Sequence, residues 1–183
     1  MREALAPLRP PVPRPPGSPK AMNVLGMFAH HPGLAKAYAP LNAHILFTSS
    51  LTDRQRELLI LRVAALRDAV YEWAQHYVLA EEAGITPDEI ALVAEGPEAE
   101  GMSDFERAML RAVDELIVDA QISAETQLAL TAELGEQQLL DLVATVGLYN
   151  IIAMATKTFG IPLDDDLVDS PGREGPPRPP APR

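Results

Sequence analysis

Glu72 and His76 are the residues whose types and spacing are best suited to chemistry. They lie four positions apart in YEWAQH, residues 71–76, and residues four apart share one face of a helix. A carboxyl group and an imidazole in one small volume can act as a general acid and a general base. The chain contains no cysteine, so no side chain can supply a thiolate. An ordinary, partly exposed ion pair is the alternative reading of the same spacing.

The neighbours of this pair are small and apolar. At 100° per residue, the face of Glu72 and His76 also carries Ala69, Leu79, Ala80 and Ala83. A carboxyl group that is buried without partners is costly in its charged form, so its pKa rises. A glutamate whose pKa is raised toward neutrality is suited to proton transfer.

The composition predicts a single all-α domain. The chain has 183 residues, of which 47% are apolar and only 5% aromatic, and no segment alternates in the manner of a strand. Most of the 18 prolines lie near the two ends. We therefore expect a helical domain of six to eight helices over 21–168, between a disordered Pro/Arg-rich tail, 1–20, and a disordered Pro-rich tail, 169–183.

Capping patterns predict where the helices begin and end. Thr52, Thr86 and Ser103 each precede Gln or Glu by three positions, which is the capping-box pattern. Asp68 is expected to cap the start of the helix that carries Glu72, and Gly84 to end that helix. The expected helices are 22–29, 32–46, 53–67, 69–83, one that begins at 87, 104–119, 124–134 and 136–158.

Charge and hydropathy limit the partners. The net charge is −11 and the acidic residues concentrate in the predicted domain, so phosphate-rich nucleic acid would be repelled. The longest uncharged segment, Leu142–Thr156, is shorter than the roughly 20 residues that a bilayer requires. No secretory signal is visible in 1–20. We expect a cytoplasmic protein that binds neither nucleic acid nor membrane.

Several segments resemble a known family. LTDRQRE and LLILRVA, residues 51–64, followed by YEWAQH and by AGI, residues 83–85, resemble the carboxymuconolactone decarboxylase-like superfamily, which includes the alkylhydroperoxidase D (AhpD) proteins. The resemblance covers roughly 22–165. In the peroxidase branch, a Glu precedes a Cys-x-x-Cys-x-x-x-His motif. In this chain the Glu corresponds to Glu57, the cysteines to Ala69 and Glu72, and the histidine to His76, so the chain resembles a cysteine-less branch.

The resemblance implies an activity of the decarboxylase type rather than thiol peroxidase chemistry. It implies a lyase or isomerase that uses no metal and no cofactor and acts on a small lactone or oxygenated organic acid. His76 would donate or accept the proton, Glu72 would be the second acid/base group, and Glu57 would orient or charge the imidazole.

The predicted walls of the substrate pocket are Tyr71, Trp73 and Asn150. The resembled decarboxylases bind a dicarboxylate, which favours an arginine near the site, and the nearest in sequence are Arg62 and Arg67. We expect Arg62 to face solvent. The acidic domain then favours a neutral or singly charged substrate.

Other readings stay open at this point. The chain could be a non-catalytic oligomeric binding or scaffold protein, or could have a hydroperoxide reductase (peroxiredoxin-type) activity inherited from the family. His30, His31 and His44 could ligate a metal, although their spacing does not suggest a site.

The helix 139–156 is apolar nearly all round, which predicts an obligate homo-oligomer. The resemblance implies a trimer or hexamer, or a dimer.

Overall fold

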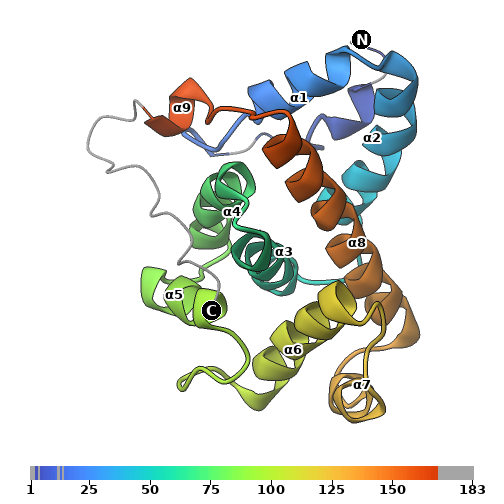
Figure 1. The fold of residues 1–183 in the computed structure, drawn as a ribbon, viewed down its shortest axis with the longest axis vertical. Helices are drawn as coiled ribbons and strands as arrows, with labels where there is room; N and C mark the ends of the chain where they lie inside the picture. The colour runs from blue at the N-terminus through green and yellow to red at the C-terminus, as the bar shows by residue number, and fades with distance from the viewer. Residues whose placement is uncertain (1–2, 4, 12, 14, 169–183) are drawn as a thin grey trace.

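The structure, a computed structural model, describes residues 3, 5–11, 13 and 15–168, and in this part of the chain it is entirely helical (Figure 1). The all-α prediction is confirmed. A four-residue helix at the end of the described chain raises the number above the six to eight expected. The helices are α1 Met22–Ala29, α2 Pro32–Phe47, α3 Asp53–Arg67, α4 Val70–Glu82, α5 Pro87–Glu95, α6 Asp104–Val118, α7 Ala124–Thr131, α8 Glu136–Thr158 and α9 Asp165–Val168.

Helix α3 is the centre of the domain. Every residue from Glu57 to Ala65 is buried, so this helix has no solvent face over more than two turns. Figure 1 shows α3 nearly end-on, with α4, α5, α6 and α8 around it. One apolar cluster joins α3 to α6 and α8, and a second joins α3 to α4 and α5. A polar residue on α3 must therefore find its partners inside the protein.

The helix starts follow the local sequence closely. Thr52, Thr86 and Ser103 each accept a hydrogen bond from the backbone N–H three residues on, and all three capping boxes are complete. Asp68 differs from its prediction. It ends α3 in the left-handed conformation, with φ of 48°, and Ala69 precedes α4 without a side-chain cap. Aspartate tolerates this backbone region better than most residues, which allows a very short connection between α3 and α4.

The N-terminal segment lies against the helices, where the sequence predicted a disordered tail over 1–20. Its described residues include a single 3-10 turn, Ala6–Leu8, that packs beside α2. Ser18 is buried, and its hydroxyl donates a 2.6 Å hydrogen bond to Glu82 of α4. The predicted tail 169–183 lies outside the described residues.

Helix α8 is long and apolar enough to cross a membrane by length and composition, but half of that stretch is buried among the other helices. The core helix of a helical domain has the same properties. In the described chain α8 packs against α3 as part of the apolar core.

Arg62 joins three helices at the side of α3 that faces α5 and α6. The sequence suggested that it faces solvent, but it is buried. Its guanidinium donates to both carboxylate oxygens of Asp114 at 2.6 and 2.7 Å, and to the carbonyl oxygens of Val93 and Ala94. Gly96 lies so close that a Cβ there would be 2.7 Å from the guanidinium. Glycine, which has no Cβ, is therefore required at position 96 for the arginine to fit.

We predict that Arg62→Met lowers the free energy of unfolding by about 3 kcal/mol, because it leaves a largely buried carboxylate and two carbonyl groups without their donor. Urea unfolding of the variant and the wild type measures this difference.

Arg111→Met is the matched control, since Arg111 forms an exposed ion pair with Glu98. Its expected effect is below about 1 kcal/mol. Equal losses in the two variants would contradict a special role for Arg62.

Candidate functional site

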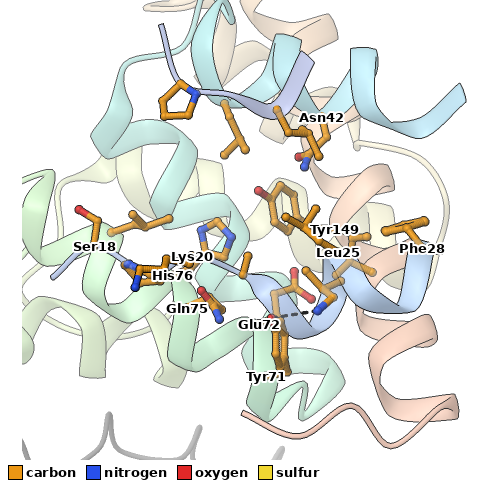
Figure 2. Close-up of a pocket in the computed structure, with 18 of the residues that line it drawn as sticks. Ser18, Lys20, Leu25, Phe28, Asn42, Tyr71, Glu72, Gln75, His76 and Tyr149 are labelled. Carbon is orange, nitrogen blue, oxygen red and sulfur yellow. Dashed lines mark hydrogen bonds between the residues drawn. The ribbon is translucent and has the colours of Figure 1, made fainter. Parts of the chain in front are cut away.

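A cavity of about 510 Å³ lies between the N-terminal segment and helices α1, α2, α4 and α8. Glu72, Gln75 and His76 of α4 face it from one side, and Asn42 of α2 and Tyr149 of α8 from another (Figure 2). Most of its other lining is apolar. Polar groups in such a chamber interact more strongly than they would in water.

Glu57 and His76 form a buried hydrogen-bonded pair at this cavity. Oε2 of Glu57 is 2.6 Å from Nδ1 of His76, and Glu57 is completely buried. The other oxygen, Oε1, accepts a 3.0 Å hydrogen bond from Nε of Arg56. The two residues come from α3 and α4, and the tight turn at Asp68 brings these helices together.

The charge state of Glu57 follows from its partners. Burial by itself would raise the pKa of this carboxyl, but the His76 ring and the Arg56 guanidinium outweigh burial and lower it. A charged carboxylate only accepts hydrogen bonds, so Nδ1 of His76 must carry the hydrogen. In the neutral ring, Nε2 is then the acceptor, and it has no hydrogen-bond partner among the described residues. The arrangement leaves a basic nitrogen available at the cavity.

Glu72 lies on the same face of α4, one turn before His76. Its environment differs from that of Glu57, because no donor reaches its carboxyl group in the described chain. Only 2% of the residue is exposed, and neither carboxyl oxygen has a hydrogen-bond partner within the described chain. Burial raises its pKa well above the ordinary value of 4.5. The side chain therefore keeps its proton to a higher pH than an ordinary glutamate does. The cavity contains a potential proton donor and a potential proton acceptor on one helix.

Tyr149 lines the cavity and is not among the pocket walls that the sequence predicted. Its ring meets His76 edge-on, with centroids 4.8 Å apart and planes at 90°. Burial raises the pKa of its hydroxyl, so the tyrosine stays protonated. Asn42 and Gln75 also line the cavity and were not predicted. Tyr149 was recognisable as a polar interruption in an apolar helix, whereas Asn42 carries no signal in the sequence.

The predicted pocket walls need correction. Tyr71 does line the cavity, but its hydroxyl is occupied, because it donates to Asp164 at 2.9 Å and accepts from the N–H of Val24. Trp73 lies outside the cavity lining, in the apolar cluster between α3, α4 and α5. Asn150 also lies outside it and accepts a hydrogen bond from Arg67. One step along α8 turns a side chain by 100°, so Tyr149 rather than Asn150 faces the cavity.

The histidines that were considered as metal ligands have other partners or lie apart. His31 accepts a hydrogen bond from the N–H of Leu34 at the start of α2. His44 is 2.7 Å from Asp141. In the described ranges, no group of three or more His, Cys, Asp or Glu side chains is arranged to hold a metal ion.

One protein-family model matches the part of the chain that contains the cavity-facing helix α4. Residues 32–115 match the sequence model of the Carboxymuconolactone decarboxylase family. These residues include α3 and α4 and therefore Glu57, Glu72 and His76. No curated protein sequence matches the chain.

Solved structures of similar fold have low sequence identity. A protein of unknown function from Agrobacterium tumefaciens, considered a candidate antioxidant defence protein AhpD, is 19% identical with a TM-score of 0.69, and the match covers 75% of this chain and 94% of that one. An uncharacterised peroxidase-related protein with an alkylhydroperoxidase AhpD core, from Ralstonia eutropha JMP134, is 20% identical with a TM-score of 0.70, over 79% and 77% of the two chains. A peroxidase-related protein from Silicibacter sp. TM1040 is 14% identical with a TM-score of 0.67, over 80% and 82%.

The fold, the family match and the lack of cysteine agree with one another. Over residues 32–115 the chain therefore matches the Carboxymuconolactone decarboxylase family, its fold is that of the AhpD-like structures, and it contains no cysteine.

Proposed function

We propose that this protein is a cofactor-independent acid/base enzyme of the lyase or isomerase type that acts on a small lactone or oxygenated organic acid. One observation carries the proposal. Two carboxyl groups whose pKa values are shifted in opposite directions lie beside one imidazole at a single cavity. The pKa of Glu57 is lowered, and that of Glu72 is raised. Two titratable groups whose environments push their pKa values apart are suited to separate acid and base roles.

In this proposal His76 is the general base and Glu72 the general acid. For an isomerisation, Nε2 of His76 takes a proton from a carbon next to a carbonyl, and the electron pair of the broken C–H bond moves into an enolate. Glu72 then returns a proton to another carbon. For a decarboxylation, the bond between the substrate carbon and its carboxylate breaks and CO2 leaves. The electron pair of that bond stays on the substrate carbon, which then takes the proton of Glu72. Glu57 keeps the imidazole in the correct tautomer and stabilises its charged form.

The chain offers no support for thiol peroxidase chemistry. The two cysteine positions of the peroxidase motif correspond to Ala69 and Glu72, and the whole chain contains no cysteine. Peroxide reduction by the family mechanism needs a thiolate and a partner thiol. Any peroxidase activity would have to draw on a different electron donor.

We predict that, in a screen of small lactones and keto acids, the wild type turns over at least one compound and His76→Gln lowers kcat/KM by about 10²- to 10⁴-fold. Glu72→Gln should lower kcat to a similar degree, because the amide has no proton to give. Steady-state kinetics with each variant measures both effects.

His30→Gln is the control, since His30 is exposed and lies outside the cavity lining. Full activity in His76→Gln would overturn the proposal, and so would the absence of turnover across the whole panel. A hydroperoxide turnover that disappears in His76→Gln would favour the peroxidase alternative.

The raised pKa of Glu72 predicts a specific dependence of stability on pH. The folded protein keeps this proton while the unfolded chain releases it near pH 4.5. The stability contributed by the proton is therefore complete below that pH and is lost as the pH rises toward the folded-state pKa. Relative to Glu72→Gln, the wild type should lose up to about 1.4 kcal/mol per pH unit above pH 4.5.

Urea unfolding at several pH values between about 5 and 8 measures this trend. Glu98→Gln removes an exposed carboxyl group and serves as the control. Parallel stability profiles for the wild type and Glu72→Gln would show that Glu72 is charged in the folded protein.

We also propose that the protein forms a homo-oligomer through the outer face of α8. Four large apolar residues of this helix are exposed in the single chain, namely Leu140, Val143, Ile151 and Met154. They recur at intervals of three, eight and three residues, which places them along one side of the helix. A second copy of the same face is the simplest partner that would cover them.

We predict that Leu140→Glu combined with Ile151→Glu reduces the particle mass in solution to that of a single chain, because charges in the interface would remain unpaired. Light scattering coupled to size exclusion measures the mass. Leu128→Glu, on the exposed surface of α7, is the control. A wild type that is already monomeric would refute this interface.

A further inference from the structure

The cavity contains buried acceptor atoms that no group of the described chain satisfies. Both carboxyl oxygens of Glu72 and Oδ1 of Asn42 are fully buried and have no hydrogen-bond partner among the described residues. The two residues come from α4 and α2, and both line the cavity. Figure 2 shows them at the cavity, with the ring of Tyr149 between them in this view. The unpaired acceptors are therefore a property of the cavity and not of a single helix.

Unpaired buried acceptors need an explanation. The great majority of buried polar atoms in proteins have a hydrogen-bond partner, since leaving one unpaired is unfavourable. The oxygen of an asparagine amide can only accept, and a protonated carboxyl group keeps one oxygen that can only accept. The missing partner is therefore an O–H or N–H group, and a ligand in the cavity would bring it.

The rest of the polar lining points to the same kind of ligand. Nδ1 of His76 faces Glu57, so its Nε2 is a further acceptor, and this nitrogen has no partner within the described chain. Two donors of the lining are already used inside the protein, because the hydroxyl of Tyr71 and the amide of Gln75 both donate to Asp164. The cavity thus offers more acceptors than a ligand without donor groups could use.

The charges around the cavity are of both signs. The carboxyl groups of Glu57 and Glu72 and the guanidinium of Arg56 all act on Tyr149, and the lining also contains the exposed Lys20. An ammonium ligand at the acceptors would require Glu72 to ionise among mostly apolar neighbours. A hydroxyl group requires no new charge, because it can donate to an amide oxygen and exchange hydrogen bonds with a protonated carboxyl group. The surroundings favour an uncharged donor.

We infer that the cavity binds a small molecule that carries a hydroxyl group, and that Oδ1 of Asn42 accepts the hydrogen bond of that hydroxyl. A second hydroxyl of such a ligand would donate to Glu72. This inference rests on the proposed function and narrows it to lactones and oxygenated acids that are hydroxylated. A volume of about 510 Å³ is large enough for a ring with its substituents. Asn42 takes no part in proton transfer, so its role is to select the substrate.

The test is a binding measurement, so that it gives an answer even if the protein turns nothing over. Four probes share one six-membered ring. Tetrahydropyran-4-ol carries the hydroxyl group, tetrahydropyran lacks it, tetrahydropyran-4-one has a carbonyl group in its place, and tetrahydropyran-4-amine has an ammonium group. Dissociation constants come from NMR titration of the full chain near neutral pH. The wild type is expected to bind the alcohol about tenfold more tightly than each of the other three, as one buried hydrogen bond predicts.

Asn42→Leu is the decisive variant, because it removes the acceptor and keeps a side chain of similar size. It should bring the affinity for the alcohol to within about twofold of that for tetrahydropyran, and leave tetrahydropyran binding unchanged. Asn42→Ala removes the same acceptor and replaces the leucine variant if that variant does not fold. Asn150→Leu is the matched control, since Asn150 lies outside the cavity lining. Thermal unfolding confirms that each variant is folded.

The outcomes separate the inference from the proposed function. A wild type that binds the ketone or the amine as tightly as the alcohol overturns the inference. An unchanged preference for the alcohol in Asn42→Leu also overturns it, and so does the absence of binding by all four probes. The predicted binding pattern without turnover of any lactone or acid supports the hydroxyl site and counts against the acid/base function. Turnover restricted to compounds without a hydroxyl group supports the function and overturns the hydroxyl site.

Discussion

The hydrogen bond between Glu57 and His76 is the interaction on which the site depends. It connects the centre of α3 to α4 in a region where Glu57 has no access to water. A buried carboxylate is tolerated only when charged or polar groups surround it, and here the imidazole takes one oxygen while Arg56 takes the other. The pair fixes which nitrogen of His76 faces the cavity. The proposed chemistry at the cavity begins from that orientation.

The two glutamates show how position alone separates the properties of identical side chains. Glu57 is surrounded by donors, so its pKa falls and it stays charged. Glu72 is buried to nearly the same extent without any donor in the described chain, so its pKa rises. A protein gains no stability from an unsatisfied carboxyl group, and residues of this kind tend to occur at functional sites. In the resemblance to the peroxidase branch this position corresponds to a cysteine, and this chain has a carboxyl group there.

The N-terminal segment belongs to the site in a way that its composition does not suggest. Residues 15–21 line the cavity, and the Ser18 hydroxyl bonds to Glu82 at the far end of α4 from Glu72. Glu72 and His76 therefore share a cavity whose mostly apolar lining comes in part from residues far from them in sequence.

Much of the fold and part of the site could be predicted from the sequence, because their causes are local. Capping boxes at Thr52, Thr86 and Ser103 start their helices through contacts three residues apart, and the spacing of Glu72 and His76 places them on one face. The sequence by itself also established the absence of cysteine and with it the loss of the thiol positions. Only the tertiary structure decided the rest. Three features depend on side chains that lie far apart in sequence. They are the burial of Arg62 beside Asp114, the position of Tyr149 rather than Asn150 at the cavity, and the opposite pKa shifts of Glu57 and Glu72. Packing alone decides which donors reach a buried group, and the spacing of residues along one helix carries no record of it.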